Sequence, residues 1–307
     1  MLVLYLALYF ATNVIYGILT KKCSDVVCGG RTIFQALCVI QNSVTAMIFF
    51  LCLTGFKLVV TPENILFGLA LSVTCTGSLL LFLYTLSKFD IADVTVFKSG
   101  GCMILTYVIG LIIFSEKITL TNAIQLTVIA AAIGLVYYEH KSMAMKRKDK
   151  NSAFAILLLI LLAVILAMQN LVNKLYMENL PNGSSGFLDR NLNSFFFFTN
   201  VFQLLFGVTG FLFLYFRTKP TKAQLAPYFT PANLCVNSVN TIMSNLVGLF
   251  STLIIALMDM SVFSPISSAI GIIAAGASSL LVKEKPSKFS IIAMALSVAA
   301  VLLTLFV

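Results

Sequence analysis

The chain has 307 residues, of which 60% are hydrophobic and only 10% are charged. A soluble domain of this length has too little interior to bury so much apolar surface, so the composition excludes a soluble globular protein and predicts an integral membrane protein. The net charge of +9 comes without a basic stripe interleaved with aromatic residues, which argues against nucleic-acid binding.

Ten apolar runs follow one another along the chain, each close to the 20 or so apolar residues that a helix needs to cross a bilayer. Residues that start or interrupt helices separate several of them. Thr61-Pro62-Glu63 supplies an N-cap, a proline and an acidic first turn, and Ser87-Lys88-Phe89-Asp90 is a tight turn. The predicted spans cover residues 2–20, 33–55, 64–86, 91–114, 120–138, 153–174, 194–216, 232–256, 261–282 and 289–307. We therefore predict an all-α membrane protein with ten transmembrane helices.

The second half of the sequence repeats the plan of the first half at an offset of 168 positions. Ser115-Glu116-Lys117-Ile118-Thr119 aligns with Lys283-Glu284-Lys285-Pro286-Ser287, and Leu81-Phe82 aligns with Leu249-Phe250. Five spans per half is an odd number, so the second half enters the membrane upside down, as in the inverted repeats of many transporters. The predicted units are a five-helix repeat at 1–138, a basic hinge loop at 139–152 and a second five-helix repeat at 153–307.

Lysine and arginine gather in alternate loops. The loops after odd-numbered spans hold 15 of them, and the loops after even-numbered spans hold 3. Lys98 and Lys174 fall within spans or at their edges, which accounts for all 20. The positive-inside rule therefore predicts that the odd-numbered loops are cytoplasmic and that both termini lie outside. The expected location is the cell membrane.

Polar side chains at bilayer depth are costly and face the protein interior, so they are candidates for a functional site. Asn13 lies in the middle of the first span, and Gln169 and Asn170 lie at the matching depth of the sixth. These amides could form two walls of one cavity. Alternatively, they could hold helices together, where each amide contributes about 1 kcal/mol.

The eighth predicted span carries polar and small residues at intervals of three or four: Asn237, Asn240, Thr241, Ser244, Gly248 and Ser251. That spacing places them on one helical face, where amides and hydroxyls need water or substrate opposite them. We therefore predict that this face lines a cavity. The ninth span instead carries a face of small residues, which favours close helix packing.

Lys98 lies well inside the fourth span, about 10 Å from its end at 1.5 Å per residue. Its side chain could reach back to the surface, or its ammonium could hold a carboxylate or phosphate in a cavity. No Asp or Glu of the sequence lies at mid-membrane depth, which argues against proton coupling through a carboxylate. The sequence also lacks an HExxH motif, a P-loop and a nucleophile elbow, so it predicts no catalytic residue, cofactor or metal site.

The stretches at about 62–138 and 231–307 share one order: an apolar span, a short turn, a second span that ends at a Glu-Lys pair, and a final span of small residues. This order resembles the EamA-type repeat of the drug/metabolite transporter superfamily, which also contains nucleotide-sugar and sugar-phosphate transporters. The resemblance covers all ten spans in plan but only Glu116 and Glu284 in identity. The proline that is frequent early in the fourth helix of that family is missing.

The resemblance carries further implications. The fourth helix of sugar-phosphate and nucleotide-sugar transporters often carries a lysine near the position of Lys98, which favours anion binding. The second and seventh helices of the family are more peripheral, which ranks Gln41-Asn42 and Asn200 with Gln203 lower as candidates. Family members are usually described with cytoplasmic termini, opposite to the orientation that the charges predict.

Taken together, these patterns predict a secondary carrier, not an enzyme, that moves a small polar metabolite by alternating access. The predicted substrate-binding residues are Asn13, Lys98, Gln169, Asn170, Asn237, Asn240 and Ser244. Glu116 and Glu284 are expected to be structural, each a carboxylate near a following helix start. The alternatives are an exporter of lipophilic drugs or lipid-linked molecules, and a scaffold or receptor subunit that transports nothing. The expected partners are a small-molecule substrate and the lipid bilayer, and the sequence does not give the oligomeric state.

Overall fold

The computed structural model describes residues 2–23, 32–86, 91–117, 120–147, 152–180, 186–281 and 287–305. In these residues the chain forms helices and no strand. The helices are α1 Leu2–Lys22, α2 Thr32–Leu53, α3 Pro62–Leu86, α4 Ile91–Ile113, α5 Leu120–Arg147, α6 Ser152–Glu178, α7 Arg190–Thr218, α8 Lys222–Leu225, α9 Pro231–Ile255, α10 Met260–Leu281 and α11 Lys288–Leu305. Apart from the short α8, each coincides with one of the ten apolar runs, so the prediction of an all-α chain is confirmed.

Seven helices of the described residues are long and apolar enough to cross a membrane: α1, α2, α3, residues Leu157–Glu178 of α6, α7, α9 and residues Met260–Ser278 of α10. Shorter apolar segments occur in α4 and α5. Large apolar side chains such as Val3, Ile112 and Phe216 are exposed on these helices, as side chains in contact with lipid are. The chain is therefore a multi-pass membrane protein.

Two elements differ from the prediction. Helix α5 continues to Arg147, so most of the expected hinge loop at 139–152 is helical, because Glu, Lys, Met, Ala and Arg are good helix formers even where they are polar. Helix α8 was not predicted, since its four residues are too few to show a hydrophobic period. Thr221 and Gln224 cap it reciprocally, each side chain bonding the other's backbone N–H.

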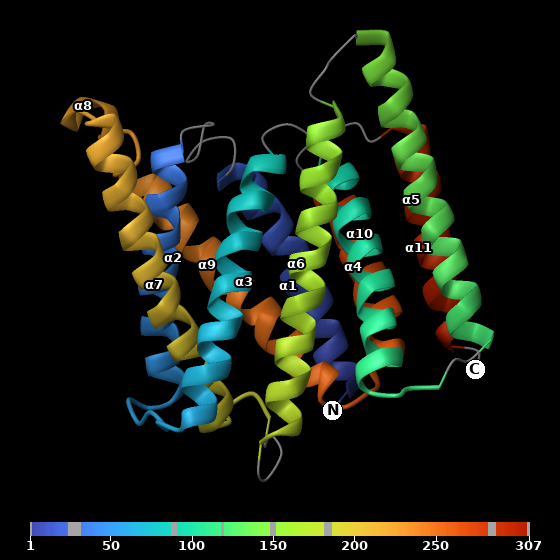
Figure 1. Cartoon of the computed structure of the whole chain (residues 1–307), viewed down its shortest axis with the longest axis horizontal. Helices are drawn as coiled ribbons and strands as arrows, with labels where there is room; N and C mark the ends of the chain where they lie inside the picture. Colours follow the sequence, from blue (N-terminus) through green and yellow to red (C-terminus); the bar gives the residue numbers. More distant parts are fainter. Residues whose placement is uncertain are drawn as a thin grey trace.

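Helices from the two halves of the chain pack against each other (Figure 1). Helix α1 packs against α9 and α10, and α6 packs against α3 and α4. Helix α2 packs against α7 and α9, and α7 also packs against α3. The pairs α4 with α10 and α5 with α11 complete the bundle. Figure 1 shows that α1 begins and α11 ends at one side of the molecule, whereas α5 ends and α6 begins at the opposite side.

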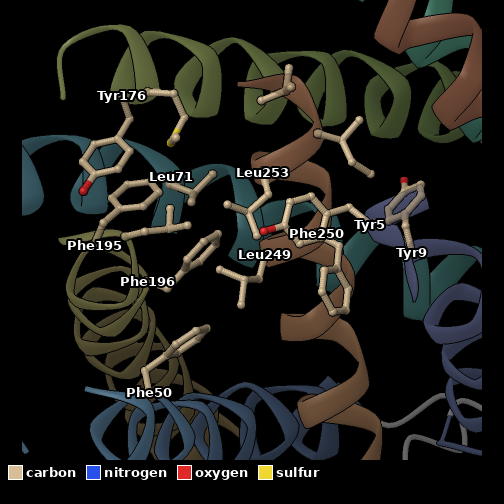
Figure 2. Packing of buried hydrophobic residues seen from close by; sticks show 14 of the residues in the cluster. Tyr5, Tyr9, Phe50, Leu71, Tyr176, Phe195, Phe196, Leu249, Phe250 and Leu253 are labelled. Atoms are coloured by element: carbon tan, nitrogen blue, oxygen red, sulfur yellow. The ribbon is translucent and has the colours of Figure 1, made fainter. Parts of the chain in front are cut away.

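A cluster of buried apolar residues, here called the aromatic cluster, fills the side of the bundle where α1 begins (Figure 2). The ring of Tyr176 stacks on that of Phe195 with centroids 3.9 Å apart, and the ring of Phe50 stacks on that of Phe196 at 5.3 Å. The Tyr176 hydroxyl donates to Asn64 Oδ1 at 2.8 Å, so its polar atom is satisfied. The labelled residues of Figure 2 come from α1, α2, α3, α6, α7 and α9, so the cluster joins both halves of the chain: Tyr5, Tyr9, Phe50, Leu71, Tyr176, Phe195, Phe196, Leu249, Phe250 and Leu253.

Candidate binding cavity

A cavity of about 280 Å³ lies between the two halves of the chain. Its walls come from α1, α2, α3, α4, α6, α7, α9 and α10. Most of the side chains that line it are amides, hydroxyls or small residues, and Lys98 is the only charged one among the lining residues that the structure describes. Such a wall can satisfy the polar groups of a solute at a depth where lipid could not.

Five of the seven predicted site residues line this cavity, and they come from both halves of the chain: Asn13, Lys98, Gln169, Asn170 and Ser244. The sequence predicted that the amide of α1 and the two amides of α6 lie at matching mid-span depths. In the structure these three amides are parts of the wall of one cavity. Gln169 Nε2 donates to Ser78 Oγ on α3 at 2.7 Å, and Asn170 Nδ2 donates to Thr106 Oγ1 on α4 at 3.2 Å.

Asn237 and Asn240 are not among the residues that line the cavity, and their contact with a solute stays a prediction. Both are buried. Asn237 Nδ2 donates to Gln41 Oε1 at 2.9 Å, and Asn237 Oδ1 accepts from Cys38 Sγ at 3.1 Å. Asn240 Oδ1 accepts from Thr20 Oγ1 at 2.9 Å. The cavity occupies the middle of the bundle, whereas α1 and α2 close against the first turns of α9 and satisfy these amides.

Of the four α2 and α7 amides that ranked low, Gln41 does not line the cavity and the other three do: Asn42, Asn200 and Gln203. Thr241 Oγ1 on α9 donates to Asn42 Oδ1 at 2.6 Å. In the sequence these residues stand out as amides in the middle of spans. They ranked low because the second and seventh helices of the resembled family are more peripheral. Asn173 and Asn245 also line the cavity and were not singled out from the sequence.

The small residues of α10 pack closely on α4, as predicted. Ser264 Oγ donates to the Met103 carbonyl at 2.9 Å, and Ser268 Oγ donates to the Ser99 carbonyl at 2.8 Å. A Cβ at Gly271 would lie only 2.9 Å from Ser99 Oγ, so a larger residue there would push the helices apart. The same two serines and Gly271 also line the cavity, so this face of α10 has both roles.

The ammonium of Lys98 lies at the cavity wall, with Nζ 4.2 Å from the centroid of the Phe82 ring. A cation–π contact of this kind contributes about 0.5–2 kcal/mol and leaves the N–H donors of the ammonium available. Lys98 forms no ion pair with any residue that the structure describes. It is therefore the group of the cavity best suited to an anionic substituent of a solute.

Two charged side chains hold the turn between α9 and α10. The carboxylate of Glu116, in the segment that follows α4, accepts hydrogen bonds from the backbone N–H groups of Met260 and Ser261, each at 2.8 Å. Lys174 Nζ on α6 donates to the Ile255 and Met258 carbonyls, each at 3.3 Å. An anion at the start of α10 and a cation at the end of α9 both suit the helix dipoles.

Glu116 thus contacts a helix start, as expected for a structural carboxylate, but the helix differs from the predicted one. It caps α10, in the other half of the chain, and not α5, which follows it in sequence. Glu284 lies outside the residues that the structure describes.

The aromatic cluster borders the cavity on the side where α1 begins, here called the closed end of the cavity. Tyr9 and Phe196 belong both to its wall and to the aromatic cluster, and the α9–α10 turn lies on the same side. In the other direction the cavity extends as far as Leu86, the last residue of α3.

No family model and no curated protein matches this chain. Among proteins of known structure, 24 chains match it. One is a crystal structure described only as that of a "protein", with 13% sequence identity and a TM-score of 0.62, over 98% of this chain and 97% of that chain. At this identity the likeness shows the fold alone.

Proposed function

We propose that this protein is a secondary carrier that moves a small polar metabolite across a membrane by alternating access. The observation that carries the proposal is a cavity with many polar side chains in its wall, at the centre of a multi-pass membrane protein and built from helices of both halves. In transporters built from repeats, the solute site lies near the bilayer midplane between the repeats. Polar residues are tolerated at that depth because they face such a cavity.

We further infer that all ten long helices cross the membrane as two inverted five-helix repeats of the EamA type. The packing pattern supports this inference, because advancing each helix by five places in the series of ten reproduces the main contacts. The contacts of α1 with α9 and α10 become those of α6 with α3 and α4, and the contact of α2 with α9 becomes that of α7 with α3. Figure 1 also shows α1 and α6 running in opposite directions, as an inverted repeat requires.

The charge distribution supports an orientation in the cell membrane with both termini outside and the odd-numbered loops in the cytoplasm. In intact cells, a cysteine introduced at Ser152 should be shielded from an impermeant thiol reagent, and one added after Val307 should react. The reverse labelling pattern would give the orientation usual in the resembled family and would overturn this part of the proposal.

The cavity favours a small metabolite over the alternatives. Its volume of about 280 Å³ lies just below the range of ligand pockets, about 300–1,000 Å³. A lipophilic or lipid tail would offer no hydrogen-bonding group to the amides, the hydroxyls and the Lys98 ammonium of the cavity wall. A scaffold that transports nothing has no use for polar side chains around a cavity at this depth.

The experiment is an uptake screen with purified protein in proteoliposomes, using amino acids, sugar phosphates, nucleotide sugars and cationic drugs. A carrier should show saturable uptake of one class, and unlabelled solute of the same class inside the vesicle should accelerate it. Uptake restricted to the cationic drugs would favour the exporter alternative. Absence of uptake for every class would favour a scaffold.

A further inference from the structure

One buried oxygen of the cavity wall, Oδ1 of Asn173, has no hydrogen-bond partner in the part of the chain that the structure describes. Asn173 lies on α6 one turn beyond Gln169 and lines the cavity. The residue is 7% exposed, and its Oδ1 is enclosed without a hydrogen bond to any residue that the structure describes. The two amides before it on α6, Gln169 and Asn170, donate to hydroxyls of α3 and α4.

An unpartnered amide oxygen is costly in this environment. Buried polar atoms are paired in the great majority of cases, because a buried acceptor that loses water and gains nothing in return destabilises the fold. Lipid offers no replacement. The cavity that Asn173 lines can supply one, either from water or from a solute that enters and leaves it.

The position of Asn173 along α6 places it at the closed end of the cavity. It is the last residue of α6 that lines the cavity. Lys174, which follows it, is bound to carbonyls at the end of α9, and Tyr176 belongs to the aromatic cluster. Lys98 lies in the first half of α4, which begins at the opposite side of the bundle (Figure 1). The cavity therefore has a cation toward one end and an unpartnered amide at the other.

We propose that Asn173 is a solute-contact residue that accepts a hydrogen bond from a hydroxyl or amino group of the transported molecule. This inference rests on the proposed transport function of the cavity and deepens it. The solute class it defines is a small metabolite with a hydrogen-bond donor on the part that reaches the closed end. A molecule of the same size without that donor leaves the Asn173 oxygen unpaired, so Asn173 discriminates between the two.

The test compares Asn173→Leu with the parent protein in two measurements on the purified full chain. The first is thermal stability without solute, which should stay the same or rise, because the change removes an unpaired polar group. The second is the affinity for probes that differ by one donor, serine against alanine and glucose phosphate against deoxyglucose phosphate. The donor-bearing member of the transported pair should bind the variant about 3- to 10-fold more weakly, and the variant should no longer discriminate within the pair.

Asn237→Leu is the matched control, because the same substitution there removes an amide that the protein satisfies. It should lower stability and leave the discrimination within each pair intact. If Asn173→Leu does not fold, Asn173→Ala serves the same comparison. Lost stability with unchanged discrimination in the Asn173 variants would overturn the inference and assign Asn173 to helix packing. A parent protein that takes up no solute and is stabilised by no probe would instead overturn the proposed function, and this inference with it.

Discussion

The polar residues of α9 form two regions that look alike in sequence and differ in what satisfies them. In the first turns, Asn237 and Asn240 are hydrogen-bonded to side chains of α1 and α2. Further along, Ser244, Asn245 and Gly248 line the cavity. Both regions follow the same spacing of three or four residues. The difference teaches that residue spacing identifies a polar helix face. Whether that face bonds to other helices or lines a cavity depends on where the neighbouring helices pack against it.

The first region is a complete network. Gln41 Nε2 donates to the Leu234 carbonyl at 2.7 Å and to Ser238 Oγ at 3.0 Å, and Gln41 Oε1 accepts from Tyr228 Oη at 2.9 Å. Substitution of a residue whose polar groups bond to other protein residues should lower the stability of the protein. Substitution of a residue that lines the cavity should change the affinity for solute or its uptake. The predictions below test this division, beginning with the largest expected effect.

Removing the Glu116 carboxylate should cause the largest loss of stability. Glu116→Ala leaves two backbone N–H groups of α10 without their charged acceptor, and a hydrogen bond to a charged group contributes about 1.5–3 kcal/mol. We expect thermal unfolding of the purified protein to show a loss of about 3 kcal/mol. Glu63→Ala is the control, because that side chain is exposed on the first turn of α3. Equal losses of stability in the two variants would show that the contact of Glu116 with α10 does not stabilise the fold.

Removing the charge of Lys98 should affect solute and leave folding intact. Lys98→Met keeps the bulk of the side chain over Phe82 and removes the ammonium. If an anionic group binds there, affinity in a transport assay should fall by roughly 10- to 150-fold, corresponding to about 1.5–3 kcal/mol. Lys98→Arg should be partly tolerated. An unchanged affinity in Lys98→Met would leave the amides to recognise a neutral or cationic solute.

Breaking the network of the first region should have a smaller effect on stability. Asn237→Leu leaves Gln41 Oε1 and the Cys38 thiol each without one partner, and an unpaired buried polar group costs about 1–3 kcal/mol. We expect a loss of about 2 kcal/mol in thermal unfolding, with uptake per folded molecule maintained. Full stability together with lost uptake would place Asn237 on the solute path and remove the distinction between the two regions.

The helix positions could be predicted from the sequence because the apolar runs are long and polar breaks separate them. The polar C-terminal end of α5 could not, since helix propensity continues where hydropathy stops. In the cavity, depth alone identified Asn13, Gln169 and Asn170. Asn173 was missed because it is followed by Lys174, which resembles the edge of a span. The hydrogen bonds of Lys174 to carbonyls at the end of α9 join residues that are distant in sequence, so the sequence alone could not predict them.

The central claim is that the cavity is the path of the solute, and Gly248→Leu tests it most directly. Gly248 lines the cavity, and a Cβ there would meet only Phe196 Cε1, at 3.7 Å, so the new side chain fills the cavity without a backbone clash. Leucine also has a higher helix propensity than glycine, by about 0.5–1 kcal/mol. Gly134→Leu on α5 is the control, because a Cβ there meets nothing within 4 Å.

The measurement is uptake by proteoliposomes of the solute that the parent protein transports in the screen. Gly248→Leu should reduce uptake to background with stability equal to or above that of the parent, and Gly134→Leu should leave uptake unchanged. Normal uptake by a folded Gly248→Leu protein would contradict the claim, because a solute that crosses with the cavity filled does not use it.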